Sequence, residues 1–232
     1  MKTKGLIPRT WRFLKKFFLI LFVAQLLYII LLRWVDPPFT FTQLGDWFRG
    51  YGLKRDYVDR SEMSRNIRLA VISSEDQLFA DHSGFDWKSI EKAMDYNKRK
   101  PNRVHGASTI SQQTAKNVFL WQGRSWIRKA METYFTFMIE HIWGKKRILE
   151  VYLNVIEMGP GVFGIEAASR HYFHKSAANL SRAEASRIAA CLPNPKKFFA
   201  SPASKYVLYR SVVIQKQMTI LAADPDIQKI IN

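Results

Sequence analysis

The sequence predicts a mainly α-helical fold preceded by one apolar N-terminal segment. Apolar residues recur at spacings of three and four along most of the chain, and residues that begin or end helices bound these stretches. No strong run of alternating apolar and polar residues, the pattern of a half-buried strand, appears. A chain of 232 residues with 47% hydrophobic content is long enough for one sizeable domain plus an extra segment.

The extra segment lies at the N-terminus. We divide it into a basic leader, 1–16, and an apolar anchor, 17–35, because Phe17 to Leu32 contains no charge and the run approaches the length that crosses a bilayer. Pro37 and Pro38 then end the helix. The basic leader predicts a cytoplasmic N-terminus and an exported remainder, in a single-pass membrane protein. A cleaved signal peptide is the alternative, but no small-residue cleavage site follows the run.

The rest of the chain divides into three parts: a linker over 36–60, a helical domain over 61–222 and a C-terminal tail over 223–232. The linker is rich in aromatic residues, and two interpretations stay open, contact with the bilayer interface or ordinary packing. Within the domain, caps and periodicity predict helices over 62–80, 87–94 after the cap Asp86, 108–118, 126–143, 145–154, 164–172, 181–191 and 204–221. Residues 98–105 and the glycine-rich 159–164 are predicted loops.

The charge balance points to a polyanionic partner. The net charge is +17, and many of the cations lie outside the leader. For an anchored domain the candidates are anionic membrane lipids and phosphate-bearing lipid substrates; nucleic acid fits the charge but not the compartment. The single cysteine, Cys191, excludes an intramolecular disulfide. His171 and His174 are three residues apart, but no third metal ligand falls in register with them.

Glu75 is the most informative residue. At helical spacing it falls on a stripe with Ile67, Val71, Leu78 and Phe79. A carboxylate on a buried stripe costs free energy unless it is paired or protonated, and a raised carboxyl pKa is useful in general acid–base catalysis. A satisfied structural carboxylate is the alternative.

Two further blocks carry polar groups that could bind a substrate. In 106–113, small residues are followed by hydroxyls and amides at a predicted helix start, which suits phosphate or sugar hydroxyls. In the second block Arg128 and Glu132 are four apart on one predicted helix, and further cations lie nearby in the sequence: Lys116, Arg124 and Lys129. Cations around one carboxylate predict a pyrophosphate or metal–pyrophosphate clamp; a solvated surface pair is the alternative.

These blocks occur together and in order, and the set resembles the glycosyltransferase domain of bacterial peptidoglycan synthases, glycosyltransferase family 51. The resemblance covers about residues 60–200. The matching residues are Glu75-Asp76-x-x-Phe79-x-x-His82-x-Gly84-x-Asp86, Gly106-Ala107-Ser108-Thr109-Ile110-Ser111-Gln112-Gln113, Arg128-Lys129-x-x-Glu132, Ile148-Leu149-Glu150-x-Tyr152-Leu153-Asn154 and Gly164-x-x-Ala167-Ala168-x-x-Tyr172-Phe173. No transpeptidase region follows, so the chain is similar to the single-activity form of the family.

The resemblance implies a lysozyme-like helical fold with a membrane-proximal lobe, and an enzyme that polymerises lipid II into β-1,4-linked glycan strands with inversion and release of undecaprenyl pyrophosphate. Glu75 would be the general base, and Glu132 the second catalytic carboxylate, which holds the leaving group with the cations. The implied substrate-binding residues are Asp76, Phe79, His82, Ser108, Thr109, Gln112, Gln113, Lys116, Arg124, Arg128 and Lys129. A divalent cation, Mg or Mn, near Glu132 is left open. So are contacts with other cell wall synthases or divisome proteins.

Two other functions remain as alternatives. A membrane-anchored muramidase-type hydrolase on the same fold would need an acid and a positioned water, but no cationic clamp. A non-enzymatic basic membrane scaffold would need the charge but not Glu75.

Overall fold

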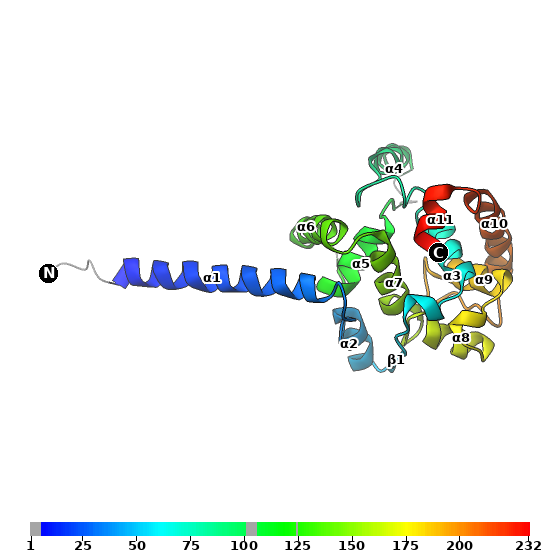
Figure 1. Cartoon of the computed structure of the whole chain (residues 1–232), viewed down its shortest axis with the longest axis horizontal. Helices are drawn as coiled ribbons and strands as arrows, with labels where there is room; N and C mark the ends of the chain where they lie inside the picture. Colours follow the sequence, from blue (N-terminus) through cyan, green and yellow to red (C-terminus); the bar gives the residue numbers. More distant parts are fainter. Residues whose placement is uncertain (1–5, 101–105, 124) are drawn as a thin grey trace. The chain divides into compact units, whose positions relative to one another are not determined.

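The computed structural model describes residues 6–100, 106–123 and 125–232 (Figure 1). The chain divides into two compact units, one ending at Asp36 and one spanning Pro37–Asn232. Within the described residues it forms eleven α-helices, two short 3-10 helices and three short strands. The prediction of a mainly α-helical fold is confirmed.

The first unit is dominated by α1 (Leu6–Leu31). Its stretch Thr10–Leu31 is 22 residues long and apolar enough to cross a membrane, with a length of about 33 Å at 1.5 Å per residue. The helix starts before the predicted anchor and ends at Leu31, because the chain turns over 32–34 ahead of Pro37. Lys15 and Lys16 therefore lie in the helix, where long side chains can reach the interface.

The second unit contains two groups of packed helices (Figure 1). In one group α3 (Arg65–Glu75), α9 (Arg182–Cys191) and α10 (Lys205–Leu221) pack against one another. In the other, α5 (Ile110–Phe119) packs against both α6 (Trp126–Ile142) and α7 (Lys145–Val155). Cys191 is buried in the first group.

A small sheet joins the linker to the domain, and the sequence analysis did not predict it. Strand β3 (Val162–Phe163) pairs in parallel with β1 (Lys54–Arg55) and antiparallel with β2 (Glu157–Gly159). Strands of two or three residues are too short for a period to show. Gly161 is required here, because its φ is +67° and a Cβ would lie 2.2 Å from the Tyr51 carbonyl oxygen. The predicted glycine loop over 159–164 is therefore partly strand.

Helix boundaries differ most from prediction around Glu75. The predicted helix over 62–80 ends at Glu75, and 77–82 are turns and bends, since the chain leaves the helix at Asp76 with φ −161°. The other predicted helices are confirmed to within about five residues, including the caps at Asp86, Thr109 and Ser181. The predicted loop over 98–105 starts later, because α4 continues to Arg99, and its residues 101–105 lie outside the described residues. Two helices were not predicted: α2 (Phe41–Phe48) in the linker and α11 (Pro225–Ile231) in the tail. The remaining helices are α4 (Trp87–Arg99), with no fully buried residue, and α8 (Ile165–Phe173).

Candidate active site

Glu75 is the last residue of α3, at the edge of a cavity of about 640 Å³. Ile67, Val71 and Phe79 are buried as predicted, whereas Leu78 is 41% exposed because the helix has already ended. Burial raises the pKa of the Glu75 carboxyl, and the nearby Asp76 carboxylate raises it further. Three groups oppose this shift: hydrogen bonds from Gln113 and Ser74, and the positive charge of Arg210.

Gln113 of α5 supplies the principal neutral donor to Glu75. Its Nε2 lies 3.0 Å from Glu75 Oε2 and 3.4 Å from the Ser108 carbonyl oxygen. The Tyr152 hydroxyl of α7 donates to Gln113 Oε1 at 3.2 Å. Tyr152 is fully buried, and burial raises its pKa well above the usual value, so the hydroxyl keeps its proton. The hydrogen bond from Tyr152 to Gln113 therefore orients the Gln113 amide with its N–H group toward Glu75.

Asp76 holds the start of α5 against the end of α3. Its Oδ2 accepts from the Ile110 backbone N–H at 2.9 Å, and its Oδ1 lies 3.0 Å from His82 Nε2. Because His82 Nδ1 accepts from the Gly84 N–H at 3.1 Å, Nε2 carries the imidazole proton and donates to Asp76. Asp76, His82 and Phe79 have largely buried side chains. His82 and Phe79 are thus turned toward protein partners, whereas Asp76 also lines the cavity. Direct contact of all three with substrate stays a prediction.

Some residues of the block over 106–113 cap α5, and others line the cavity. Thr109 caps α5 in a capping box with Gln112, and both side chains are buried. The Thr109 hydroxyl also donates to the Gly84 carbonyl oxygen at 2.7 Å. Ser108 is exposed, and with Thr109 it lines the 640 Å³ cavity that contains Glu75. Four of the predicted substrate-binding residues lie in this block. Ser108 is exposed and Gln113 is half-buried, whereas Thr109 and Gln112 are buried.

Glu132 has the opposite surroundings. It is buried in α6 and paired with two cations, Arg128 at 2.7 Å and Lys129 at 2.5 Å. The solvated surface pair is therefore excluded, since the side chain of Glu132 is 4% exposed and that of Arg128 11%. Together these three residues carry a surplus of one positive charge.

Lys116 lies between the two carboxylates. It is on the same face of α5 as Gln113, three residues away, and it feels the charges of both Glu132 and Glu75. Burial lowers the pKa of its ammonium group, with a further contribution from Arg128 and Lys129. Among the described residues no acceptor lies within hydrogen-bonding distance of its amine. A ligand oxygen could therefore bind there.

A divalent cation near Glu132 stays a prediction. Both oxygens of the Glu132 carboxylate already accept hydrogen bonds, from Arg128 and Lys129. Across the part of the chain that the structure describes, no three His, Cys, Asp or Glu side chains gather as a metal site.

One predicted residue cannot be placed, and two others were missed. Arg124 lies outside the described residues. Arg210 of α10 and Tyr152 are not among the predicted site residues, yet both act on Glu75, by charge and through Gln113 respectively. A tyrosine among core residues is a usable signal, because a buried hydroxyl needs a partner.

Glu157, to which the sequence analysis assigns no role, belongs to a neighbouring cluster. Lys196 Nζ lies 2.7 Å from Asp46 Oδ1 and 3.5 Å from Glu157 Oε1. Burial and the adjacent Asp46 raise the pKa of Glu157 to about 7. These residues line a cavity of about 420 Å³ that also contains Gln113 and Lys116.

Comparison with known proteins identifies similar sequences over most of the chain. The transglycosylase family model matches residues 42–219. A biosynthetic peptidoglycan transglycosylase of Shewanella oneidensis is 48% identical over 221 residues, which is 91% of this chain and 92% of the relative. Proteins with the same description are 47% identical in Shigella sonnei, over 94% of both chains, and 52% identical in Escherichia coli, over 81% of this chain and 78% of the relative.

Proposed function

The chain belongs to the transglycosylase family, and from that premise we propose how its own residues carry out glycan polymerisation. It is an enzyme of peptidoglycan synthesis that acts on a lipid II-type substrate. The observation that carries the proposal is the contrast between Glu75, which receives neutral donors, and Glu132, which is ion-paired, with Gln113 and Lys116 of α5 between them.

Glu75 is the general base of the proposed reaction. Its carboxylate accepts the proton of the acceptor sugar 4-hydroxyl as that oxygen attacks the anomeric carbon of the donor. The new C–O bond forms as the bond from the anomeric carbon to the pyrophosphate oxygen breaks on the opposite face. Inversion gives a β-1,4 link. The raised pKa of Glu75 brings its basicity nearer to neutrality, where a base both stays ionised and accepts a proton well.

The cations next to Glu132 receive the leaving group. Undecaprenyl pyrophosphate departs with both electrons of the broken bond, and Lys116, Arg128 and Lys129 stabilise its charge. Glu132 acts by holding Arg128 and Lys129 in place, since it contacts both directly.

The proposed setting is the outer face of a bacterial inner membrane. α1 is compatible with a membrane anchor, and the basic residues before its apolar run favour a cytoplasmic N-terminus by the positive-inside rule. A lipid-linked donor and acceptor would then be held in the same plane as the enzyme.

The test supplies the purified full-length protein with lipid II and, separately, with intact peptidoglycan. The proposal predicts glycan polymer from lipid II and no soluble fragments from peptidoglycan. Fragments from peptidoglycan without polymer from lipid II would instead establish the hydrolase. Polymerisation that survives in the Glu75→Gln variant would remove Glu75 from the role of base.

A further inference from the structure

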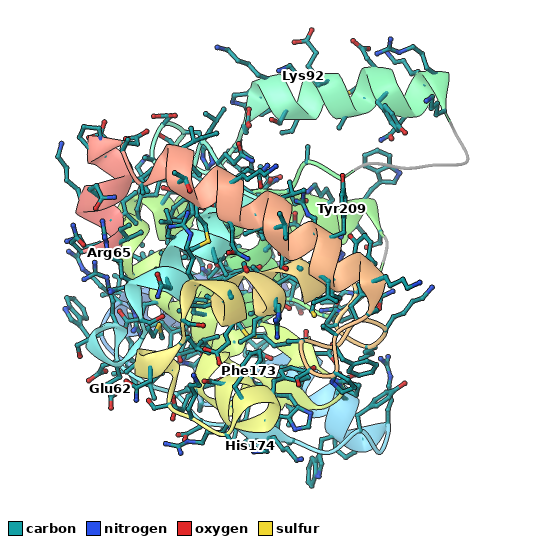
Figure 2. The ribbon with its side chains drawn as sticks, turned by 90° about the vertical axis from the view of Figure 1, so that its right-hand side faces the viewer. Glu62, Arg65, Lys92, Phe173, His174 and Tyr209 are labelled. Atoms are coloured by element: carbon teal, nitrogen blue, oxygen red, sulfur yellow. The ribbon has the colours of Figure 1, made fainter. Side chains whose placement is uncertain are left out.

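A second cationic pocket lies away from the active site. It has a volume of about 480 Å³ and is formed by β1 and α8. Lys92 of α4 lines the active-site cavity. Figure 2 shows Lys92 and His174, the residue that follows α8, at opposite ends of the domain. Figure 1 also shows α4 and α8 far apart. The lining residues are Leu53, Lys54, Arg55, Ala167, Arg170, His171 and His174.

The pocket is built almost entirely from basic side chains, and no carboxylate lines it. Arg170 is paired with Glu166 at 2.7 Å, so its charge is offset. Lys54 has no such partner among the described residues. Lys54, His171 and His174 line the same pocket. Burial lowers the pKa of His171, and the charges of Lys54 and His174 lower it further. An anion bound in the pocket would relieve this repulsion.

His174 occupies its position at a conformational cost. It follows α8 with φ +55°, the left-handed conformation that helices usually give to glycine at this place. It is the one non-glycine residue with positive φ among the described residues. Histidine is tolerated there better than most residues, but glycine would fit without strain. The position therefore favours a role for the imidazole side chain that glycine could not fill.

The neighbouring helix identifies the source of the anion. α2 buries polar side chains and exposes aromatic ones. Its buried residues are Thr42, Gln43 and Asp46, whereas its aromatic residues are exposed, with Phe48 80% exposed. Outward aromatic side chains next to cations are typical of a membrane interface. The guanidinium of Arg55, which lines the pocket, lies 4.2 Å from the ring centroid of Phe39, just before α2. Arg55 therefore links the pocket to the segment that leads into α2.

We propose that the pocket lined by Lys54, Arg55, His171 and His174 binds the phosphate of an anionic lipid headgroup while the aromatic residues of α2 rest in the interface. This site is separate from the catalytic cleft and does not depend on the proposed chemistry, but it rests on the proposed membrane setting. Free phosphate offers the same chemistry, but it would leave the outward aromatic residues of α2 without a partner.

The test measures lipid binding to the full-length protein in a neutral detergent by native mass spectrometry. The probes are dioctanoyl phosphatidylglycerol, dioctanoyl phosphatidylcholine and inorganic phosphate. We expect phosphatidylglycerol to bind at least about tenfold more tightly than phosphatidylcholine, a difference of about 1.4 kcal/mol. The double variant Lys54→Gln/His174→Gly should lose that preference, and it should fold normally because glycine suits the left-handed position.

The matched control is Lys205→Gln, which removes one charge from an exposed lysine at the start of α10 and should keep the preference. Equal affinity for the two lipids in the wild-type protein, or an undiminished preference in the double variant, would overturn the proposal. Inorganic phosphate that binds as tightly as phosphatidylglycerol would overturn the lipid as the occupant.

Discussion

Glu75 and Glu132 are two carboxylates of one site held in opposite ways. Glu75 lies at the end of α3, next to neutral donors from Gln113 and Ser74, and burial raises its pKa. Glu132 lies within α6 and is paired directly with Arg128 and Lys129. The carboxylate that we propose as the base has neutral donors, whereas the carboxylate that we propose to organise the cations has charged partners.

The difference also predicts opposite effects on stability. Ionised Glu75 is costly to bury, so the folded protein is stabilised when this group is neutral. Ionised Glu132 is already compensated, and its removal would leave Arg128 and Lys129 close together without their carboxylate. Single substitutions can therefore separate a catalytic carboxylate from an organising one.

The largest expected effect is on catalysis by Glu75→Gln. Loss of a general base should lower the turnover number about 10³-fold, which is the middle of the range of about 10²–10⁴ for such groups. KM should change little. Steady-state polymerisation of lipid II measures both constants. An unchanged or raised melting temperature would show that the variant folds, and a large rise in KM alone would assign Glu75 to binding.

The second effect is on stability in Glu132→Gln. Breaking the buried ion pairs should lower the free energy of unfolding by about 3 kcal/mol, because two cations lose their partner. Chemical denaturation of the wild-type protein and of both glutamine variants gives the comparison directly. Equal stability of Glu132→Gln and Glu75→Gln would contradict the proposed contrast.

Glu157 is both buried and paired with Lys196, so it tests which of the two effects dominates the pKa of a carboxyl group. Its pKa is raised to about 7, so its stabilising contribution is present below the unfolded value near 4.5 and is lost as pH rises through 7. Glu157→Gln should match the wild-type stability at pH 5 and exceed it by about 1–2 kcal/mol at pH 8. A variant less stable than wild type at pH 8 would mean that the ion pair with Lys196 outweighs burial.

The smallest effect is expected from Tyr152→Phe. Without the hydroxyl, the Gln113 amide is no longer oriented toward Glu75, and polymerisation should fall about tenfold, the equivalent of one hydrogen bond. The acid limb of the pH profile should also move to higher pH. Tyr172→Phe is the matched control, because that buried hydroxyl donates to the Met158 carbonyl oxygen. If both variants behave alike, Tyr152 has only a structural role.

Periodicity and capping residues predicted the helical fold because long helices repeat their pattern many times. Thr109 and Ser181 show the capping box in the sequence itself. The short strands around Gly161 could not be predicted in this way, because their pairing depends on contacts between β1 and β3 that are distant in the chain. The end of α3 at Glu75 was also missed, since Asp76 leaves the helix to bind His82 and the start of α5.

The candidate site was predictable to the extent that its residues share a local block. Arg128, Lys129 and Glu132 are one helical turn apart, and their pairing follows from spacing. The contacts of Glu75 with Gln113, and of Gln113 with Tyr152, join three separate helices. The influence of Arg210 likewise depends on the packing of α10 against α3. Long-range contacts of this kind leave no periodic signal.

The most direct test of the contrast is the pH dependence of kcat/KM for lipid II polymerisation in the wild-type protein, Gln113→Ala and Arg128→Gln. We predict an acid limb with an apparent pKa above 4.5, which reports Glu75. Gln113→Ala should move this limb to higher pH, because the amide donor that lowers the Glu75 pKa is lost. Arg128→Gln should lower the rate at every pH without moving the limb. A limb that Arg128→Gln moves and Gln113→Ala does not would contradict the assignment of Glu75 as the base.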